Sequence, residues 1–165
     1  MLPAELAERL RSRFPEPLEA RGEVTVFVAP EELQQALEHL RGEEDLAFDT
    51  LSDVTATDWP GSDPRFWLAY QLRSMRYGHR LRVKVGLPDS DPRVPSVTPM
   101  YATANWLERE VFDFFGLIFD GHPDLRRIEM PDGWVGHPLR KDEPLAGVNT
   151  QYKGAFIPPP DQRGL

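Results

Sequence analysis

The strongest constraint on the fold is a change of hydrophobic period in the middle of the chain. Apolar side chains stand at every second position of two segments: Phe66, Leu68, Tyr70 and Leu72, then Leu81, Val83 and Val85. A period of two is typical of strands with one buried face. The intervening Tyr77-Gly78-His79 suits a bend, so the pattern predicts two antiparallel strands joined by a short connection.

Two helices, a hairpin and one further strand are predicted before this pair. Leucines recur every fourth residue at Leu2, Leu6 and Leu10, which predicts a short helix that stops before Pro15. A second helix is predicted from Pro30 to Gly42, with its apolar residues on one side. A hairpin over residues 18–28, with Arg21-Gly22 as its turn, and a Thr- and Val-rich strand over residues 51–58 complete this part.

A third helix is predicted to open at Thr98-Pro99 or at Ala104-Asn105 and to end at Gly116. Its apolar residues spread around much of the circumference: Trp106, Leu107, Val111, Phe114 and Phe115. A helix that is apolar on more than one side must be covered on more than one side. We therefore expect Trp106 to belong to the core.

Together these elements predict a two-layer α+β domain over residues 1–120. Its mixed, mostly antiparallel sheet of four or five strands is covered by two helices and followed by the third. Beyond Leu117 periodicity fails, and Gly and Pro recur every few residues through Pro160. We expect residues 121–165 to form an extended interface loop and a C-terminal arm, with residues 145–165 extended and mobile without a partner.

Composition excludes several classes of function. The chain has no cysteine, so it cannot ligate an iron–sulfur cluster through thiolates or form a disulfide. Its net charge of −8 disfavours a nucleic-acid partner, because that affinity comes largely from neutralising phosphates. No apolar run approaches the roughly 18 residues of a membrane span, so we expect a cytoplasmic chain. Nucleotide-binding glycine motifs and a GxSxG elbow are also absent.

The segment from Asn105 to Pro144 crowds aromatic residues against charges, which is typical of a contact surface. Its charges are segregated. Residues 108–124 hold five acids and one arginine, a net charge of −4, whereas residues 125–141 hold four bases and two acids, a net charge of +2. Segregated charge favours oriented docking. Trp134, between Gly133 and Gly136, is expected to be an aromatic anchor there.

A metal site or acid–base pair in this segment is the weaker interpretation. On a helix Glu108 and Glu110 diverge by about 200°, and neither His122 nor His137 has a two-histidine helical spacing. Asp113, by contrast, shares a face with Glu110. Both carboxylates are expected to pair with nearby arginines in a charge network. The candidate partners are Arg109, Arg126 and Arg127.

The motifs of this segment also resemble a known family. They are Glu108-Arg109-Glu110, Asp113, Phe115-Gly116, the run from His122 to Ile128, and the run from Gly136 to Asp142. Upstream, Phe48-Asp49-Thr50-Leu51, the run from Asp53 to Ala56 and Ser96-Val97-Thr98 fit as well. In this order and spacing they resemble the C subunit of NADH-quinone oxidoreductase, the respiratory complex I. The likeness covers residues 47–145. It departs at Glu129, where the family usually has an apolar residue, and at Glu143, where it usually has an aromatic one.

The resemblance implies a non-catalytic structural and assembly subunit in the peripheral arm of a proton-pumping NADH-quinone oxidoreductase, on the cytoplasmic side of the plasma membrane. Such a subunit docks on the quinone-site subunit and the iron–sulfur subunits. It holds no cofactor, whereas FMN and the iron–sulfur clusters belong to its partners. The residues predicted at the interface are Glu108, Arg109, Glu110, Asp113, His122, Asp124, Arg126, Arg127, Trp134, His137, Arg140, Lys141, Asp142, Tyr152 and Phe156.

Two alternatives stay open at this point. The same subunit type occurs in related complexes with another electron donor, such as hydrogenase-linked or photosynthetic ones. A stand-alone enzyme built on Glu110, Asp113 and His122 is the more distant alternative.

Overall fold

The computed structural model describes residues 1–131, 133–143, 150–152 and 155–157. The helices are α1 (Pro3–Leu10), the 3-10 turn η1 (Pro30–Glu32), α2 (Leu33–Gly42) and α3 (Ala104–Phe115). The strands are β1 (Leu18–Ala20), β2 (Glu23–Val28), β3 (Thr50–Asp58), β4 (Phe66–Arg73), β5 (Arg80–Leu87), β6 (Arg93–Pro95), β7 (Ile118–Asp120), β8 (Thr150–Tyr152) and β9 (Ala155–Ile157). None of the helices in these ranges is long and apolar enough to cross a bilayer.

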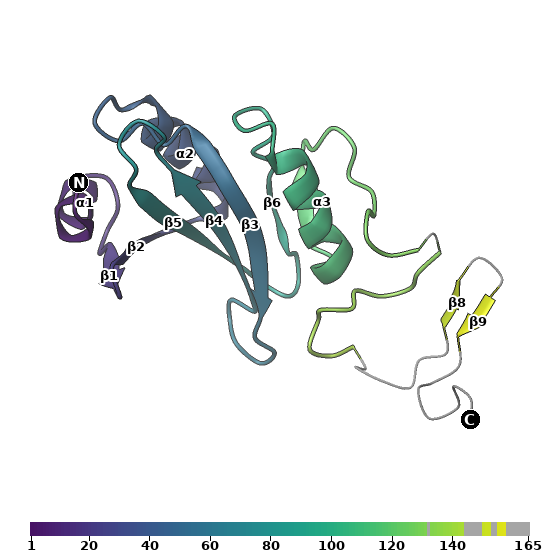
Figure 1. Ribbon diagram of the computed structural model, residues 1–165. Helices are drawn as coiled ribbons and strands as arrows, with labels where there is room; N and C mark the ends of the chain where they lie inside the picture. The colour runs from purple at the N-terminus through teal and green to yellow at the C-terminus, as the bar shows by residue number, and fades with distance from the viewer. Residues whose placement is uncertain (132, 144–149, 153–154, 158–165) are drawn as a thin grey trace, which may run out of the picture.

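Five strands form the main sheet in the order β1-β2-β5-β4-β3 (Figure 1). All neighbours are antiparallel except β2 and β5, which run parallel. The β1–β2 turn lies at Arg21 and Gly22, whose φ angles of 55° and 79° are those of a two-residue hairpin turn. The predicted α+β class and mixed, mostly antiparallel sheet are confirmed.

One hydrophobic core joins the helices to the inner face of the sheet. Its buried side chains include Leu6, Leu10, Val26, Leu37, Phe66, Leu68, Tyr70, Leu81 and Val83. The predicted phase of β4 and β5 is therefore confirmed. These residues of β4 and β5 face α1 and α2, while the residues between them face the other way.

Two details of the predicted helices are wrong. Leu2 is 67% exposed because it precedes α1 and does not join its buried stripe. Gly42 is the last residue of α2 and does not end it by a left-handed turn. The chain leaves the helix at Glu43, which is extended with φ −67° and ψ 127°.

α3 lies beside the β3 edge of the sheet (Figure 1). It begins at Ala104, the second of the two predicted starts, and ends at Gly116 in the left-handed conformation. The prediction that Trp106 is buried is wrong, since its side chain is 64% exposed. Trp106 lies on the opposite side of α3 from the buried residues Ala104 and Glu108, and the Arg109 guanidinium stacks over its ring.

Two short ladders lie outside the main sheet. β6 and β7 pair in parallel beside α3, a pair that three-residue strands cannot signal by periodicity. Within the predicted arm, residues 145–165, the structure describes only β8 and β9. They pair antiparallel, with Thr150 opposite Ile157. The expectation that this arm is extended and mobile otherwise lies outside the described residues.

Candidate functional site

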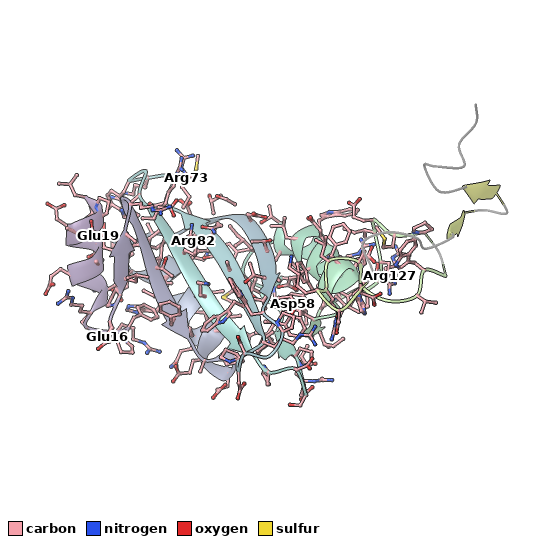
Figure 2. The ribbon with its side chains drawn as sticks, turned by 90° about the horizontal axis from the view of Figure 1, so that it is seen from below. Glu16, Glu19, Asp58, Arg73, Arg82 and Arg127 are labelled. Carbon is pink, nitrogen blue, oxygen red and sulfur yellow. The ribbon has the colours of Figure 1, made fainter. Side chains whose placement is uncertain are left out.

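Residues 121–143 fold back along α3, and buried charges of the helix hold them there. In Figure 2, Asp58 on the sheet and Arg127 on this loop lie on opposite sides of α3. We call residues 121–143 the α3 loop. Its shape depends on three groups of contacts, which centre on Glu108, Asp113 and Asp58.

Glu108 connects α3 to the residues that follow β6. Its carboxylate is fully buried and accepts hydrogen bonds from Ser96 Oγ at 2.6 Å and from the Val97 N–H at 2.7 Å. Burial raises the pKa of Glu108 to about 7, because the loss of solvation outweighs the stabilisation by these two donors. The carboxyl group therefore titrates close to neutral pH.

His122 fixes the start of the α3 loop beside Glu108. Its Nε2 lies 3.0 Å from the Asn105 carbonyl oxygen and 4.0 Å from Glu108 Oε2. Its Nδ1 accepts from the Asp124 N–H at 3.0 Å, so the hydrogen-bond network assigns the proton to Nε2. Both side chains, His122 and Glu108, are enclosed. His122 thus joins the loop to the first turn of α3.

Asp113 organises the middle of the α3 loop. Its Oδ2 accepts three successive backbone N–H groups, from Ile128 (3.0 Å), Glu129 (2.8 Å) and Met130 (2.9 Å). Its Oδ1 accepts from Arg127 Nη1 at 2.7 Å. Burial alone would raise the pKa of Asp113, but these donors outweigh it and lower the pKa below its ordinary value. The carboxylate stays ionised and holds the loop backbone.

Two arginines and a histidine bind backbone carbonyls of the same region. Arg109 Nε donates to the Arg126 carbonyl at 3.1 Å, and Arg127 Nη2 donates to the Gly136 carbonyl at 2.8 Å. His137 Nδ1 lies 3.0 Å from the Asp113 carbonyl oxygen. The predicted pairing of Asp113 with Arg127 is confirmed, while Arg109 binds backbone carbonyl groups.

Gly116 is required where the loop crosses the end of α3. Its φ is 74°, a conformation that side chains rarely adopt, and an added Cβ would lie 2.6 Å from Nε2 of His137. The Leu139 N–H then donates to the Phe114 carbonyl, a group that the helix leaves unpaired, at 3.1 Å. The end of α3 is thus covered by its own loop.

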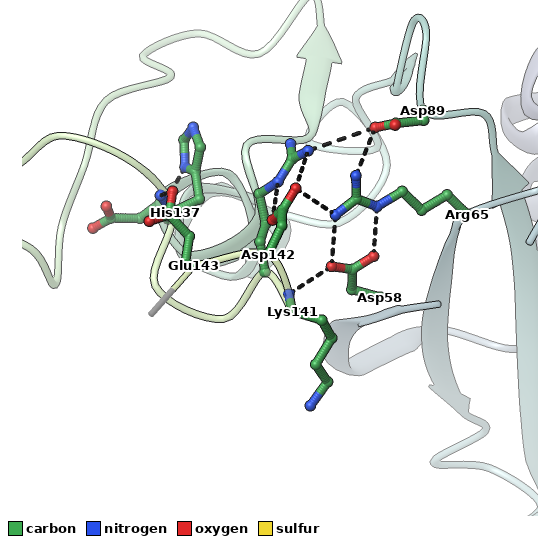
Figure 3. A network of polar contacts seen from close by, with 9 residues as sticks. Asp58, Arg65, Asp89, His137, Lys141, Asp142 and Glu143 are labelled. Carbon is green, nitrogen blue, oxygen red and sulfur yellow. Dashed lines mark hydrogen bonds and ion pairs between the residues drawn. The ribbon is translucent and has the colours of Figure 1, made fainter. Parts of the chain in front are cut away.

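An ion-pair network attaches the end of the loop to the sheet (Figure 3). Arg65 binds Asp58 through two parallel hydrogen bonds, at 2.7 and 3.0 Å, and reaches Asp89 and Asp142 at 3.1 and 2.9 Å. The Lys141 N–H donates to Asp58 Oδ2 at 2.7 Å. Arg65 and then Arg140 lower the pKa of Asp142 to about 2. Residues 140–142 are therefore held against the ends of β3 and β4.

Apolar side chains remain on the outside of this framework. Four large ones are exposed around it: Trp59 at 58%, Trp106 at 64%, Val135 at 91% and Leu139 at 49%. A groove of about 540 Å³ lies between the end of β3 and the loop. It is lined by Ala56, Thr57, Asp58, Trp59, Pro60, Phe115, Leu139 and Lys141. A hydrogen-bonded loop backbone, an apolar groove and charged borders are compatible with a docking surface. We call this region the α3 surface.

Comparison with known proteins decides the family. The family model described as "Respiratory-chain NADH dehydrogenase, 30 Kd subunit" matches residues 26–149, which include β3, β4, β5, α3 and the α3 loop. The chain belongs to this family. The resemblance inferred from the motifs of residues 47–145 is thereby confirmed.

Two relatives from this family are close in sequence. The chain is 46% identical over 167 residues to the C subunit of NADH-quinone oxidoreductase from Salinispora arenicola, covering 96% of this chain and 68% of that protein. It is 49% identical over 144 residues to the C subunit of the same enzyme from Mycobacterium ulcerans, covering 87% and 60%. The chain thus spans about three fifths to two thirds of the length of these relatives.

Solved structures agree on the fold of this family. A trypsin-resistant fragment (1-134) of Nqo5 matches with a TM-score of 0.64 and 33% identity, covering 74% of this chain and 98% of the fragment. A chain of the membrane-bound sulfane sulfur reductase, an archaeal respiratory membrane complex, matches with a TM-score of 0.69 over 93% of this chain. At 23% identity that second likeness concerns the fold alone.

Thirteen of the fifteen residues predicted at the interface fall into three groups by burial. Glu110, Asp124, Arg126, Lys141 and Asp142 are exposed around the α3 surface. His122, Arg127, Trp134, His137 and Arg140 are partly buried, and all but Trp134 have side-chain partners described above or in the network of Figure 3. Glu108, Arg109 and Asp113 lie inside the chain and bind its own backbone, so the free chain offers no surface at them.

The remaining predicted interface residues, Tyr152 and Phe156, belong to β8 and β9, where side chains are outside the described part. Sequence reasoning missed Asp58 and Arg65. The only available signal was a charged residue at each end of the Pro- and Gly-containing connection between two predicted strands.

The three residues of the stand-alone enzyme alternative do not converge. Asp113 is committed to residues 127–130, and His122 contacts Asn105 and Glu108. Glu110 is exposed, and burial, Asp53 and Glu129 raise its pKa. In the described ranges, no three His, Asp or Glu side chains are grouped so as to hold a metal ion.

Proposed function

We propose that this chain is a structural and assembly subunit in the peripheral arm of a proton-pumping NADH-quinone oxidoreductase and has no catalytic role of its own. It would dock through the α3 surface on the quinone-site subunit and the iron–sulfur subunits. The names of its two relatives from Salinispora and Mycobacterium support the assignment to that complex. In this proposal FMN and the iron–sulfur clusters belong to partner chains, and the complex holds this chain at the cytoplasmic side of the membrane.

The proposal rests on one observation: around α3 several charged side chains are buried and bind the chain itself, whereas large apolar side chains are exposed. Buried Glu108, Asp113 and Asp58 use their hydrogen bonds to shape the chain's own backbone. Large apolar side chains, such as Val135 and Leu139, remain outside. An enzyme site places reactive groups in a pocket, whereas an interface places apolar anchors on a rigid support. The α3 surface has the second arrangement.

The domain boundary fits the same proposal. We propose that residues 1–120 form the folded core and that residues 121–165 supply the contacts to neighbours. The fragment of Nqo5 described as trypsin-resistant ends at its residue 134 and aligns with 74% of this chain. Limited trypsin digestion of the free chain should therefore leave the core intact and cut the C-terminal part first. Protection of that part in the assembled complex would support docking.

Purification of the tagged chain from native membranes tests the assignment. We expect a large assembly that contains FMN and iron–sulfur clusters and that reduces quinone with NADH. An assembly that uses another electron donor would place the chain in a related complex instead. A chain recovered alone, with activity of its own, would contradict the proposal.

The non-catalytic role has a separate test. Glu110→Gln removes the exposed carboxylate of the enzyme alternative and keeps the shape of the side chain. Complexes that carry Glu110→Gln should turn over NADH at the wild-type rate per assembled particle. A rate that falls while the amount of assembled complex stays constant would show that the chain takes part in the chemistry.

Elemental analysis of the isolated chain tests the absence of a metal cofactor. It should find no stoichiometric iron or zinc.

A further inference from the structure

The face of the main sheet opposite the helices carries a second set of charges. Along β5 the outward residues are Arg80, Arg82 and Lys84, which are exposed or half-buried. The register of the sheet places Arg73 of β4 directly opposite Arg80, and Gln71 opposite Arg82. Figure 2 shows Arg73 and Arg82 on the strands, away from Asp58 and Arg127 of the α3 surface. This face is therefore separate from the surface described above.

Arg73 and Arg80 form a like-charged pair across two neighbouring strands. Like charges directly opposite each other destabilise a sheet. Arg82, the next outward residue of β5, is neutralised by Glu23 at 2.7 Å. Within the part of the chain that the structure describes, Arg73 and Arg80 have no carboxylate within 4.0 Å. Acids outnumber bases 27 to 19 in this sequence, so a shortage of carboxylates does not explain the unpaired arginines.

A hollow of about 370 Å³ lies between these arginines. Arg73, Arg80 and Arg82 line it together with Glu23, Asp53 and Gln71. Three arginines and two carboxylates leave one positive charge, which matches an anion with a single negative charge. A carboxylate has that charge and accepts two parallel hydrogen bonds from a guanidinium. A phosphate monoester carries about −1.5 to −2 at neutral pH and would be left with excess negative charge.

We propose that this hollow binds an Asp or Glu side chain of a neighbouring protein subunit. An apolar contact site lies on the same face, because the rings of Phe27 and Trp67 meet edge to face at 5.7 Å and Lys84 lies over Trp67. The partner segment therefore combines a carboxylate with an apolar residue. This second docking site is independent of the α3 surface, although its partner would belong to the assembly proposed above.

A zero-length cross-link tests the carboxylate directly. Arg73→Lys and Arg80→Lys keep the positive charge and introduce a primary amine. A carbodiimide joins such an amine to a carboxylate only where the two groups are in contact. In the assembled complex, each variant should form an amide with an Asp or Glu of another chain, identified by mass spectrometry. Arg76→Lys is the matched control. It lies on the same β4–β5 connection and should couple to Glu44 of its own chain, which Arg76 approaches to 3.7 Å.

Coupling of the Arg76→Lys control without any inter-chain product from Arg73→Lys or Arg80→Lys would overturn the inference. Products with Glu23 or Asp53 of this same chain are expected from their place in the hollow and do not count as support; only an inter-chain product does. Failure of the wild-type chain to enter any complex would instead contradict the proposed function, so the two failures are distinguishable. Tighter binding of inorganic phosphate than of acetate to the isolated chain would show a phosphate site and also overturn the inference.

Arg80→Gln provides a second test, because it should not lower the stability of the isolated chain but should weaken its assembly into the complex. In the isolated chain it removes the repulsion from Arg73, so the unfolding midpoint should stay unchanged or rise. In competition with the wild-type chain for incorporation into the complex, its share should fall by about tenfold, the equivalent of about 1.4 kcal/mol. A wild-type share for Arg80→Gln would mean that this face only meets solvent.

Discussion

Arg65 and Asp58 form a two-pronged ion pair, with Nε to Oδ1 at 2.7 Å and Nη2 to Oδ2 at 3.0 Å, at the buried junction of β3, β4 and the α3 loop. The Asp58 side chain is fully enclosed and the Arg65 side chain is 9% exposed. The same carboxylate also receives the Lys141 N–H. One ion pair therefore connects the sheet to the end of the loop.

Removing one partner of this pair should be costly. Arg65→Ala leaves a buried, unpaired carboxylate at Asp58, and we expect a loss of about 3–5 kcal/mol in the free energy of unfolding. Asp89→Ala removes the 59%-exposed member of the same network and should cost less than about 1 kcal/mol. Urea unfolding of both variants measures the difference. Equal losses would show that the pair is only a surface contact.

Because of Glu108, the free energy of unfolding should depend on pH up to about neutrality. Burial raises its folded-state pKa to about 7, above the value of the unfolded chain, so the folded state binds the extra proton between those two values. The free energy of unfolding should therefore fall as pH rises from about 4.5 to 7. Urea midpoints across this range should lose that component of the slope in Glu108→Gln. Identical slopes for the two proteins would refute the assignment.

Asp142 should have the opposite effect on stability, since its contribution should be lost as pH falls. Arg65, followed by Arg140, lowers its pKa to about 2, so its stabilising contribution is present above its unfolded-state pKa. That contribution should be lost as pH falls from about 4 to 2. Asp142→Asn should be destabilised at pH 6 and should show a smaller loss on acidification than the wild-type chain. Thermal melts at pH 6 and pH 2.5 make the comparison.

Alanine substitutions at Gly116 and Gly121 separate the stability cost of backbone strain from that of a steric clash. Both have positive φ, 74° and 81°, but only at Gly116 would a Cβ meet the His137 ring. Gly121→Ala should cost about 1 kcal/mol for its conformation alone. Gly116→Ala should cost clearly more, about 2–4 kcal/mol, because the loop must also move away from α3. Equal costs would mean that His137 yields without consequence.

Asp113 should control access to the α3 loop. Asp113→Ala removes the acceptor of three backbone N–H groups and the partner of Arg127. We expect trypsin to cut after Arg126 or Arg127 much faster in this variant than in the wild-type chain, while far-UV circular dichroism stays unchanged. Asp124→Ala, which removes only an exposed ion pair with Arg126 on the same loop, is the comparison and should change the rate far less.

The sequence predicts the sheet and its core well because one face of β4 and β5 is uniformly apolar, and this makes the phase of each strand unambiguous. It fails on α3, where charge is a poor guide to exposure. Glu108 is buried because Ser96 and Val97 supply donors, whereas Trp106 is exposed although the Arg109 guanidinium stacks over its ring. The partners of buried charges come from non-periodic segments, so no local pattern announces them.

The Arg65 network shows the same limit at longer range. Asp58 and Lys141 are 83 residues apart in the sequence, and neither position has a spacing that signals their hydrogen bond. The family motifs mark the segment from Glu108 to Asp142 as a candidate interface. They do not distinguish residues that shape the loop, such as Asp113, from residues that lie outside, such as Lys141.

Docking of the α3 surface on other subunits is tested most directly by a pair of matched leucine substitutions. Leu139 on the α3 loop is 49% exposed, and Leu18 on the β1 edge of the sheet is 51% exposed. Leu139→Asp and Leu18→Asp should change the stability of the isolated chain by similar, small amounts. Measured as the share of each variant recovered in the purified complex, Leu139→Asp should fall at least about tenfold below Leu18→Asp. Equal recovery of the two variants would contradict docking through the α3 surface.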